Sequence, residues 1–351
     1  MTHANARTLC DLLGITLPII QAPMAGVQGS ALALAVSQTG ALGSLPCAML
    51  SPEALHDELT VIKQQTDKPV NINFFCHPLS EPDPQREAAW LNALAPYYQE
   101  LGVSPPQSSA GAGRAPFNTE MADVLQVFQP AVVSFHFGLP APDLLARVKS
   151  WGAKILSTAT TVEEALWLQA HGADAIIAQG LEAGGHRGMF LTDDLSTQMG
   201  TLALVPQVVQ AVKLPVIAAG GIATAQGVAA VLALGAVAAQ VGTAYLLCPE
   251  ASTSALHRAA LASPAARHTV LTNLLSGRPA RGVVNRLMRD LGPLSRLAPD
   301  FPWASAALLP LRQQAESLGR DDFSTLWSGQ HASACQPIAA ADLTRQLSVA
   351  R

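Results

Sequence analysis

One histidine lies between two aromatic residues in the segment SFHFG, residues 134–138. Alternation along a strand would turn His136 away from Phe135 and Phe137, and active sites lie at the C-terminal ends of barrel strands. Because an ordinary imidazole titrates near neutral pH, His136 can accept a proton from a substrate or bind an anionic one. A buried histidine paired with backbone is the alternative for the same pattern.

Two glycine-bearing segments follow neighbouring apolar runs in the second half of the chain. AGGI, residues 219–222, contains Gly220 and Gly221, and QVGTAYL, residues 240–246, contains Gly242. Glycine lets the backbone approach a ligand closely, and a helix N-terminus that follows favours phosphate. Barrels commonly hold phosphate in the loops after strands seven and eight. The segments therefore predict a phosphorylated cofactor or substrate, unless the glycines only permit tight turns.

The segment AQGLEAGGHRG follows the sixth expected strand and is too polar and glycine-rich for a simple connection. Gln179 can hydrogen bond to a planar heterocycle, and Gly184 and Gly185 leave room for a flat ring. His186 and Arg187 add polar groups. The alternative for His186 is a solvated surface histidine.

Two further segments carry candidate ligand contacts. NINFF, residues 71–75, places Asn71 and Asn73 on one face of a strand, where buried amides need a ligand or a neighbouring strand as partner. Asn73 is the better ligand candidate because it is nearer the strand end. QAPMAGV, residues 21–27, ends a strand in a turn whose backbone could lie along a cofactor ring, with Met24 as an apolar wall or as ordinary core.

The elements that must position these residues alternate between short apolar runs and helical stretches, which predicts a parallel sheet with crossover helices. Ser51 and Thr161 are expected helix N-caps for residues 51–65 and 161–170, and Gly172 ends the second helix. Eight such units have the size of a (β/α)8 TIM barrel, an α/β fold. A doubly wound open sheet is the alternative. The expected strands are residues 18–21, 41–45, 70–75, 131–135, 155–157, 175–178, 216–219 and 237–241.

Two regions interrupt this rhythm. Residues 81–114 begin and end in Pro, Gly and Ser-rich sequence and predict a helical insert. From residue 250 the pattern is irregular, with a helix expected around residues 308–318. We therefore expect a cofactor-binding barrel over residues 1–250 and a helical extension over residues 251–351, which covers the barrel mouth and packs its last helix back on the barrel.

Composition excludes several classes of protein. Of 351 residues, 49% are hydrophobic and 13% are charged, which argues against disorder. A net charge of -4 without a basic tract argues against nucleic acid as a partner. The apolar stretch 228–248 is divided by glycines and polar residues, so no membrane span is expected.

Cysteine and histidine usage gives further expectations. The five cysteines are scattered without the spacing of zinc sites or disulfide frameworks, and the first residues lack an apolar secretion signal. A cytoplasmic protein without a metal is therefore expected. The dinucleotide, P-loop, zincin and α/β-hydrolase motifs are absent from the sequence.

The ordered set QAPMAGV, NINFF, SFHFG, QGLEAGGHRG, AAGGI and QVGTAYL resembles the class I nitronate monooxygenases, formerly called 2-nitropropane dioxygenases. The resemblance continues through SGRPARG and LWSGQ and so covers nearly the whole chain. It implies an FMN-binding TIM barrel that oxidises alkyl nitronates, such as propionate 3-nitronate, with molecular oxygen. The products would be a carbonyl compound and nitrite or nitrate, formed by one-electron transfer through a flavosemiquinone.

The resemblance also implies roles for individual residues. His136 matches the family's catalytic histidine and would bind or deprotonate the substrate, with His186 assisting. Nitronate and oxygen would be the only partners of a monomer or homodimer. The FMN contacts would be Gln21, Ala22, Pro23, Met24, Asn73, Gln179, Gly184, Gly185, Gly220, Gly221, Gln240, Gly242 and Thr243.

Two other functions remain open at this point. Flavin-dependent enoyl-ACP reductases share an EAGGH-like loop, and NADH:quinone reductases share the barrel, so an NAD(P)H-dependent reductase of an enone or quinone is the first alternative. The second is a non-catalytic barrel that binds a phosphorylated metabolite.

Overall fold

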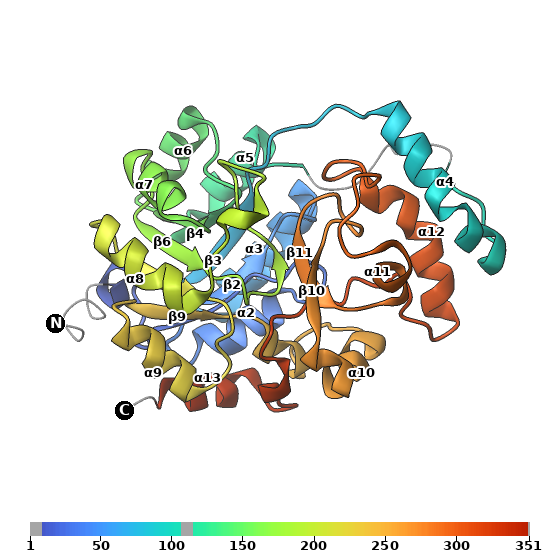
Figure 1. Ribbon diagram of the computed structural model, residues 1–351. Coiled ribbons are helices and arrows are strands. Elements are labelled where there is room, and N and C mark those ends of the chain that lie inside the picture. The colour runs from blue at the N-terminus through green and yellow to red at the C-terminus, as the bar shows by residue number, and fades with distance from the viewer. Residues whose placement is uncertain (1–8, 107–114, 350–351) are drawn as a thin grey trace.

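The computed structural model describes residues 9–106 and 115–349 and is built around an eight-stranded parallel sheet (Figure 1). Its strand order is β1-β9-β8-β6-β5-β4-β3-β2, and a parallel bridge between Ile20 and Leu42 joins the two end strands into a barrel. This confirms the predicted TIM barrel. The strands are β1 Ile19–Gln21, β2 Gly43–Pro46, β3 Val70–Phe75, β4 Val132–His136, β5 Lys154–Ala159, β6 Ala175–Gln179, β8 Val216–Ala219 and β9 Ala238–Val241.

Crossover helices surround the barrel, and several begin at the polar caps that the sequence indicates. The hydroxyl of Ser51 accepts from the Ala54 amide, and that of Thr161 accepts from the Glu164 amide. Both expected helices are therefore present. The helices around the barrel are α2 Ser30–Ser37, α3 Pro52–Gln65, α5 Thr119–Phe128, α6 Pro142–Lys149, α7 Val162–Ala170, α8 Thr201–Ala211 and α9 Ala225–Ala233.

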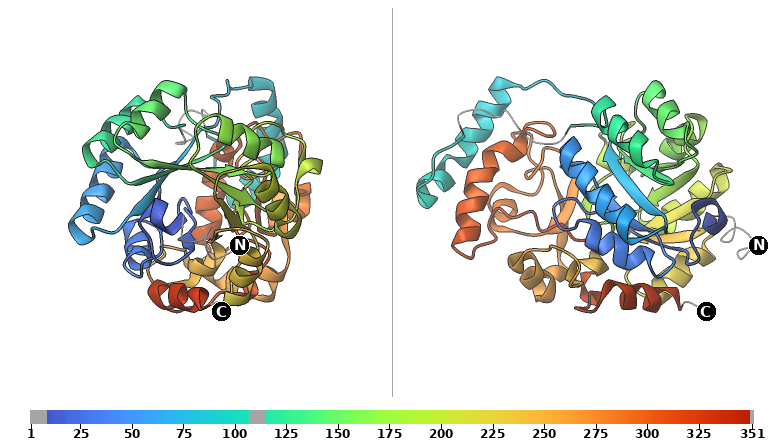
Figure 2. Two further views of the ribbon diagram at one scale, coloured as in Figure 1. Left: turned by 90° about the vertical axis from the view of Figure 1, so that its left-hand side faces the viewer. Right: turned by 180° about the vertical axis from the view of Figure 1, so that it is seen from behind.

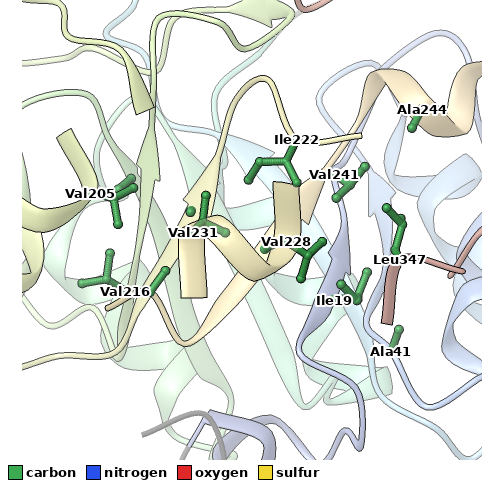
Figure 3. Packing of buried hydrophobic residues seen from close by; sticks show 14 of the residues in the cluster. Ile19, Ala41, Val205, Val216, Ile222, Val228, Val231, Val241, Ala244 and Leu347 are labelled. Atoms are coloured by element: carbon green, nitrogen blue, oxygen red, sulfur yellow. The ribbon is translucent and has the colours of Figure 1, made fainter. Parts of the chain in front are cut away.

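The core has an inner and an outer part. Inside the barrel, Ile20, Leu156 and Ile217 belong to one fully buried cluster. Outside it, strands and helices share larger clusters, and Figure 3 shows Val231 of α9 on the side of Val216 of β8 and Val228 on the side of Val241 of β9. Burial on both faces explains why these strands are almost continuously apolar.

The insert and the C-terminal extension form one second lobe, seen beside the barrel in Figures 1 and 2. Helix α4 (Pro84–Leu101) packs along α12 (Ala304–Ser317) rather than on the barrel. Trp90 is fully buried there and donates its indole N–H to the Ala304 carbonyl at 3.2 Å. The remaining helices of this lobe are α10 Ala255–Ala262 and α11 Arg286–Leu291. Residues 107–114 of the expected insert lie outside the described residues.

The extension is not purely helical as predicted. It contains strands β10 (Thr269–Thr272) and β11 (Ala280–Val283), which pair antiparallel, and β11 also pairs with the two-residue strand β7 (Gly185–His186). These strands are too short to show a sequence periodicity. They attach the second lobe to the loop after β6.

The last helix, α13 (Ala340–Ser348), lies across the barrel wall and contacts α2 and α9. Leu343 and Leu347 are buried against this wall, and the Thr344 hydroxyl lies 2.9 Å from the phenolic oxygen of Tyr245. No helix of the described residues is long and apolar enough to span a membrane; the apolar stretch 228–248 forms α9, β9 and the 3-10 helix η2 (Thr243–Leu247). The other 3-10 helices are η1 Leu195–Thr197, η3 Pro264–Arg267 and η4 Ala332–Ala334.

Candidate active site

A cavity of about 180 Å³ lies at the carboxyl ends of the barrel strands, where loops from the second lobe close over it. Most residues singled out in the sequence meet there. The predicted site residues that line the cavity are Ala22, Pro23, Met24, Asn73, His136, Gln179, Gly184, Gly185, His186, Gly220, Gly221, Gln240, Gly242 and Thr243.

Gln21 lies behind this surface, so the structure does not bring its side chain to the cavity. The side chain is fully buried and donates to Gln28 Oε1 at 2.7 Å. It also accepts a hydrogen bond of 2.9 Å from the Ser44 amide. Gln21 therefore joins the ends of β1 and β2 and supports the turn that carries Ala22.

His136, the last residue of β4, presents a neutral imidazole to the cavity. Its Nε2 lies 3.2 Å from the His186 carbonyl, which can only accept, so Nε2 carries the proton. Its Nδ1 then accepts from the Thr158 hydroxyl at 3.1 Å. Burial lowers the pKa of His136 to about 3, and the positive charges of Arg278 and Arg187 lower it further. The hydrogen bond to the His186 carbonyl raises this pKa but does not outweigh burial. The ring can therefore act as a base or as an N–H donor.

Phe137 does not point away from His136, contrary to the strand-alternation prediction. The strand ends at His136, and Phe137 has a left-handed backbone with φ of 69°. Its ring centroid lies 4.5 Å from that of His136. The guanidinium of Arg278 stacks 4.2 Å from the centroid of the Phe137 ring, which brings a positive charge close to the imidazole.

His186 is fixed by the second lobe and is not a solvated loop histidine. Its Nε2 lies 2.8 Å from the Ser276 hydroxyl, and its ring centroid is 5.5 Å from that of Trp327. The His186 carbonyl also accepts from the Gln179 amide at 3.0 Å. Gln179 thus couples the end of β6 to the loop that carries His186.

Arg187, expected to add a polar group to the site, is instead fully buried beside it. Its guanidinium donates to the carbonyls of Gln179 and Gly180, both at 2.7 Å. Burial lowers its pKa to about 10, so the group stays cationic at neutral pH. It stabilises the end of β6 and contributes a positive charge near His136.

The two asparagines of β3 find partners on neighbouring strands. Asn73 donates to the Ser134 hydroxyl at 2.9 Å and borders the cavity, whereas Asn71 donates to the Ser44 hydroxyl at 3.0 Å and lies deeper. Asn73 is therefore the residue of this pair that a ligand can reach.

The glycines after β8 are required by both backbone and space. Gly220 and Gly221 have φ of 119° and 70°, a backbone conformation that residues with a side chain rarely adopt. A Cβ on Gly220 would lie 2.8 Å from Thr201 Oγ1 and 3.1 Å from the Gly180 carbonyl oxygen. These glycines bring the backbone to the cavity edge, where the sequence predicts a phosphorylated ligand.

Gln240 supplies an independent sign of a ligand. Its Oε1 is buried and has no hydrogen-bond partner among the described residues, although the residue lines the cavity. An unpaired buried amide oxygen costs about 1–3 kcal/mol. A bound group that donates a hydrogen bond would satisfy it.

Several cavity residues were missed, although Trp327 and Gly329 lie in the LWSGQ segment that belongs to the family resemblance. Thr158 could have been found from its position at the end of β5, but Trp327, Gly329 and His331 come from the second lobe, far along the chain. His257 of α10 is also among them; burial lowers its pKa to about 4, and its Nε2 lies 3.0 Å from the Trp327 carbonyl. Within the described residues, no group of three or more acidic, histidine or cysteine side chains could hold a metal ion.

Comparisons of the sequence and of the structure with known proteins point to the same family. A family model described as nitronate monooxygenase matches residues 6–349. The chain is similar to nitronate monooxygenase of Paraburkholderia phytofirmans, with 43% identity across 98% of this chain and 95% of that one. It is also similar to nitronate monooxygenase of Pseudomonas aeruginosa, with 44% identity across 96% of each chain. A solved structure, nitroalkane oxidase from Streptomyces ansochromogenes, superposes with a TM-score of 0.88 at 38% identity and covers 97% of this chain and 96% of that one.

Proposed function

The chain belongs to the nitronate monooxygenase family, and we propose that it uses FMN and molecular oxygen to oxidise alkyl nitronates to a carbonyl compound and nitrite or nitrate. The observation that carries this proposal is the meeting of His136 with the glycine loops after β8 and β9 around one cavity. A base or anion-binding group and a phosphate-binding edge thus serve the same pocket.

The residues present fit FMN. Two loops would hold the phosphate of FMN: the loop of Gly220 and Gly221, and the loop of Gly242 and Thr243. The unpaired side-chain oxygen of Gln240 would accept a hydrogen bond from a donor group elsewhere on FMN. Gln179 and Asn73 would contact its polar edges. When bound, FMN supplies the electron-accepting group of the reaction.

His136 would act on the substrate in one of two ways. With a preformed nitronate, the N–H on Nε2 would leave the His186 carbonyl and donate to a nitronate oxygen, and the charges of Arg187 and Arg278 favour the anion. With a neutral nitroalkane, the Cα–H bond breaks, its electron pair stays on the substrate, and the proton moves to Nδ1. The Thr158 hydroxyl, which now donates to Nδ1, must turn away in that step.

The test combines cofactor identity with turnover. We expect the purified protein to release FMN on denaturation and to consume oxygen with ethylnitronate, propyl-1-nitronate or propionate 3-nitronate. Anaerobic mixing should bleach the flavin with nitronate much faster than with NADH. Protein without flavin, or rapid bleaching by NADH together with no nitronate oxidation, would refute the proposal and favour a pyridine-nucleotide reductase.

A further inference from the structure

A four-residue segment of the second lobe, residues 328–331, crosses the loops after three barrel strands. We call Ser328, Gly329, Gln330 and His331 the strap. The Gly329 amide donates to Thr243 Oγ1 at 2.9 Å, and the Gln330 amide donates to the Glu182 carbonyl at 3.0 Å. The strap is thus bonded to the loops after β9 and β6.

The third bond of the strap comes from the His331 side chain. Its Nδ1 lies 3.2 Å from the Gly221 carbonyl after β8, and because a carbonyl only accepts, Nδ1 donates. Gly329 and His331 both line the cavity. One short segment therefore contacts the loops after β6, β8 and β9, all of which line the cavity.

The approach of the strap is close enough to require glycine on both sides. A Cβ on Gly184 would lie 2.5 Å from the Gly329 amide nitrogen, and a Cβ on Gly329 would lie 2.8 Å from the Glu182 carbonyl oxygen. Gly184 thus makes room for the strap, whereas the sequence reading assigned that space to a flat ring. A Cβ on Gly185 would have no atom within 4 Å, so the open space lies beside Gly185.

The chemistry of the strap matches a phosphate. Thr243 Oγ1 accepts from Gly329 and so keeps its own proton for a ligand oxygen. The His331 ring is held through Nδ1 by the Gly221 carbonyl and lines the cavity, so it lies at the edge formed by the glycines after β8. A phosphate between the loops after β8 and β9 would meet both side chains.

We propose that His331 is a phosphate-binding residue for FMN, supplied to the barrel by the second lobe. This inference rests on the proposed function, since it assumes that FMN is the ligand of the cavity. It assigns to the strap a role in recognising the mononucleotide, in addition to closing the cavity.

The test compares two flavins that differ only in the phosphate. Full-length protein freed of flavin is titrated with FMN and with riboflavin, and the dissociation constants are measured from flavin fluorescence. We expect His331→Ala to weaken FMN binding about ten- to hundredfold, as for loss of a hydrogen bond to a charged group, and to change riboflavin binding less than about threefold. His331→Asn, which can keep a donor near the Gly221 carbonyl, should give the same selective loss.

A matched control is His268→Ala, because His268 is exposed and does not line the cavity. It should leave both dissociation constants unchanged. Equal weakening of FMN and riboflavin in the folded Asn variant, or no weakening of FMN in either variant, would overturn the phosphate assignment while leaving the proposed function intact. Wild-type protein that binds no FMN would instead refute the proposed function.

Discussion

His136 is neutral, so its ring can accept a proton, and the charges of Arg187 and Arg278 would stabilise the nitronate that forms although they disfavour the imidazolium. Replacement by Asn removes the proton acceptor but leaves an N–H donor. We expect kcat/KM for a neutral nitroalkane to fall about 10²- to 10⁴-fold, and that for the preformed nitronate to fall much less, because only the nitroalkane must lose a proton. Oxygen consumption with each substrate measures both values, and equal losses would rule out the base role.

The buried His257 makes the free energy of unfolding depend on pH. Burial lowers its pKa to about 4, whereas an imidazole in an unfolded chain titrates near 6.5. Between these pH values the unfolded chain binds more protons, so the free energy of unfolding decreases as pH falls from about 6.5 toward 4.

Replacing His257 by Gln removes this proton uptake and can keep a donor for the Trp327 carbonyl. We expect the free energy of unfolding to fall less steeply over this range, by up to about 1.4 kcal/mol per pH unit. Urea denaturation at several pH values measures the slope, with the exposed His268→Gln as control. Superimposable slopes for the wild type and the His257 variant would contradict the assignment.

Single positions were predictable from sequence where a strand end fixed them. His136, Asn73 and Gln179 end or nearly end their strands and line the cavity as expected. Phe137 and Arg187 were not predictable in the same way. A left-handed residue ends the alternation at Phe137, and the buried carbonyls that hold Arg187 have no signature in the sequence.

At the scale of elements, the loop carrying β7 depends on its fit to the strap. In Gly184→Ala the new Cβ would clash with the backbone of Ser328 and Gly329, so the strap must move. We expect FMN and riboflavin both to dissociate faster, by about tenfold or more, as measured by flavin release on dilution. Gly152→Ala is the control, because its Cβ would meet nothing within 4 Å although its φ of 88° adds strain. Unchanged release in the Gly184 variant would show that the strap does not confine the flavin.

The barrel strands and their crossover helices were predictable because burial on both faces gives continuous apolar runs with polar caps between them. Strands β7, β10 and β11 were not, since two to four residues are too few to show a period. The pairing of β7 with β11 joins segments about 95 residues apart and is decided by tertiary packing, whereas β10 and β11 are neighbours in the chain.

At the scale of the whole molecule, Trp90 joins the insert to the extension. Trp90→Ala should lower the free energy of unfolding of the second lobe by about 3–5 kcal/mol, because it removes a fully buried indole and its bond to Ala304. Urea denaturation followed by circular dichroism measures this loss. Leu79→Ala serves as control, since Leu79 is 81% exposed. A loss as small as that of the control would mean that α4 does not stabilise this lobe.

The union of insert and extension is the part of the architecture that sequence reading could not supply. The insert and α12 are separated by about 200 residues, and each reads locally as an ordinary amphipathic helix. The shared cluster around Trp90, Tyr98 and Leu311 shows that they form one unit.

The position of the strap after all eight barrel strands also orders events during synthesis. His331 is made 110 residues after Gly221, whose carbonyl it contacts. A nascent barrel therefore keeps its pocket open on one side until the strap has been synthesised. Premature termination before residue 328 would leave a protein whose cavity lacks this wall, however well the eight strands had already assembled.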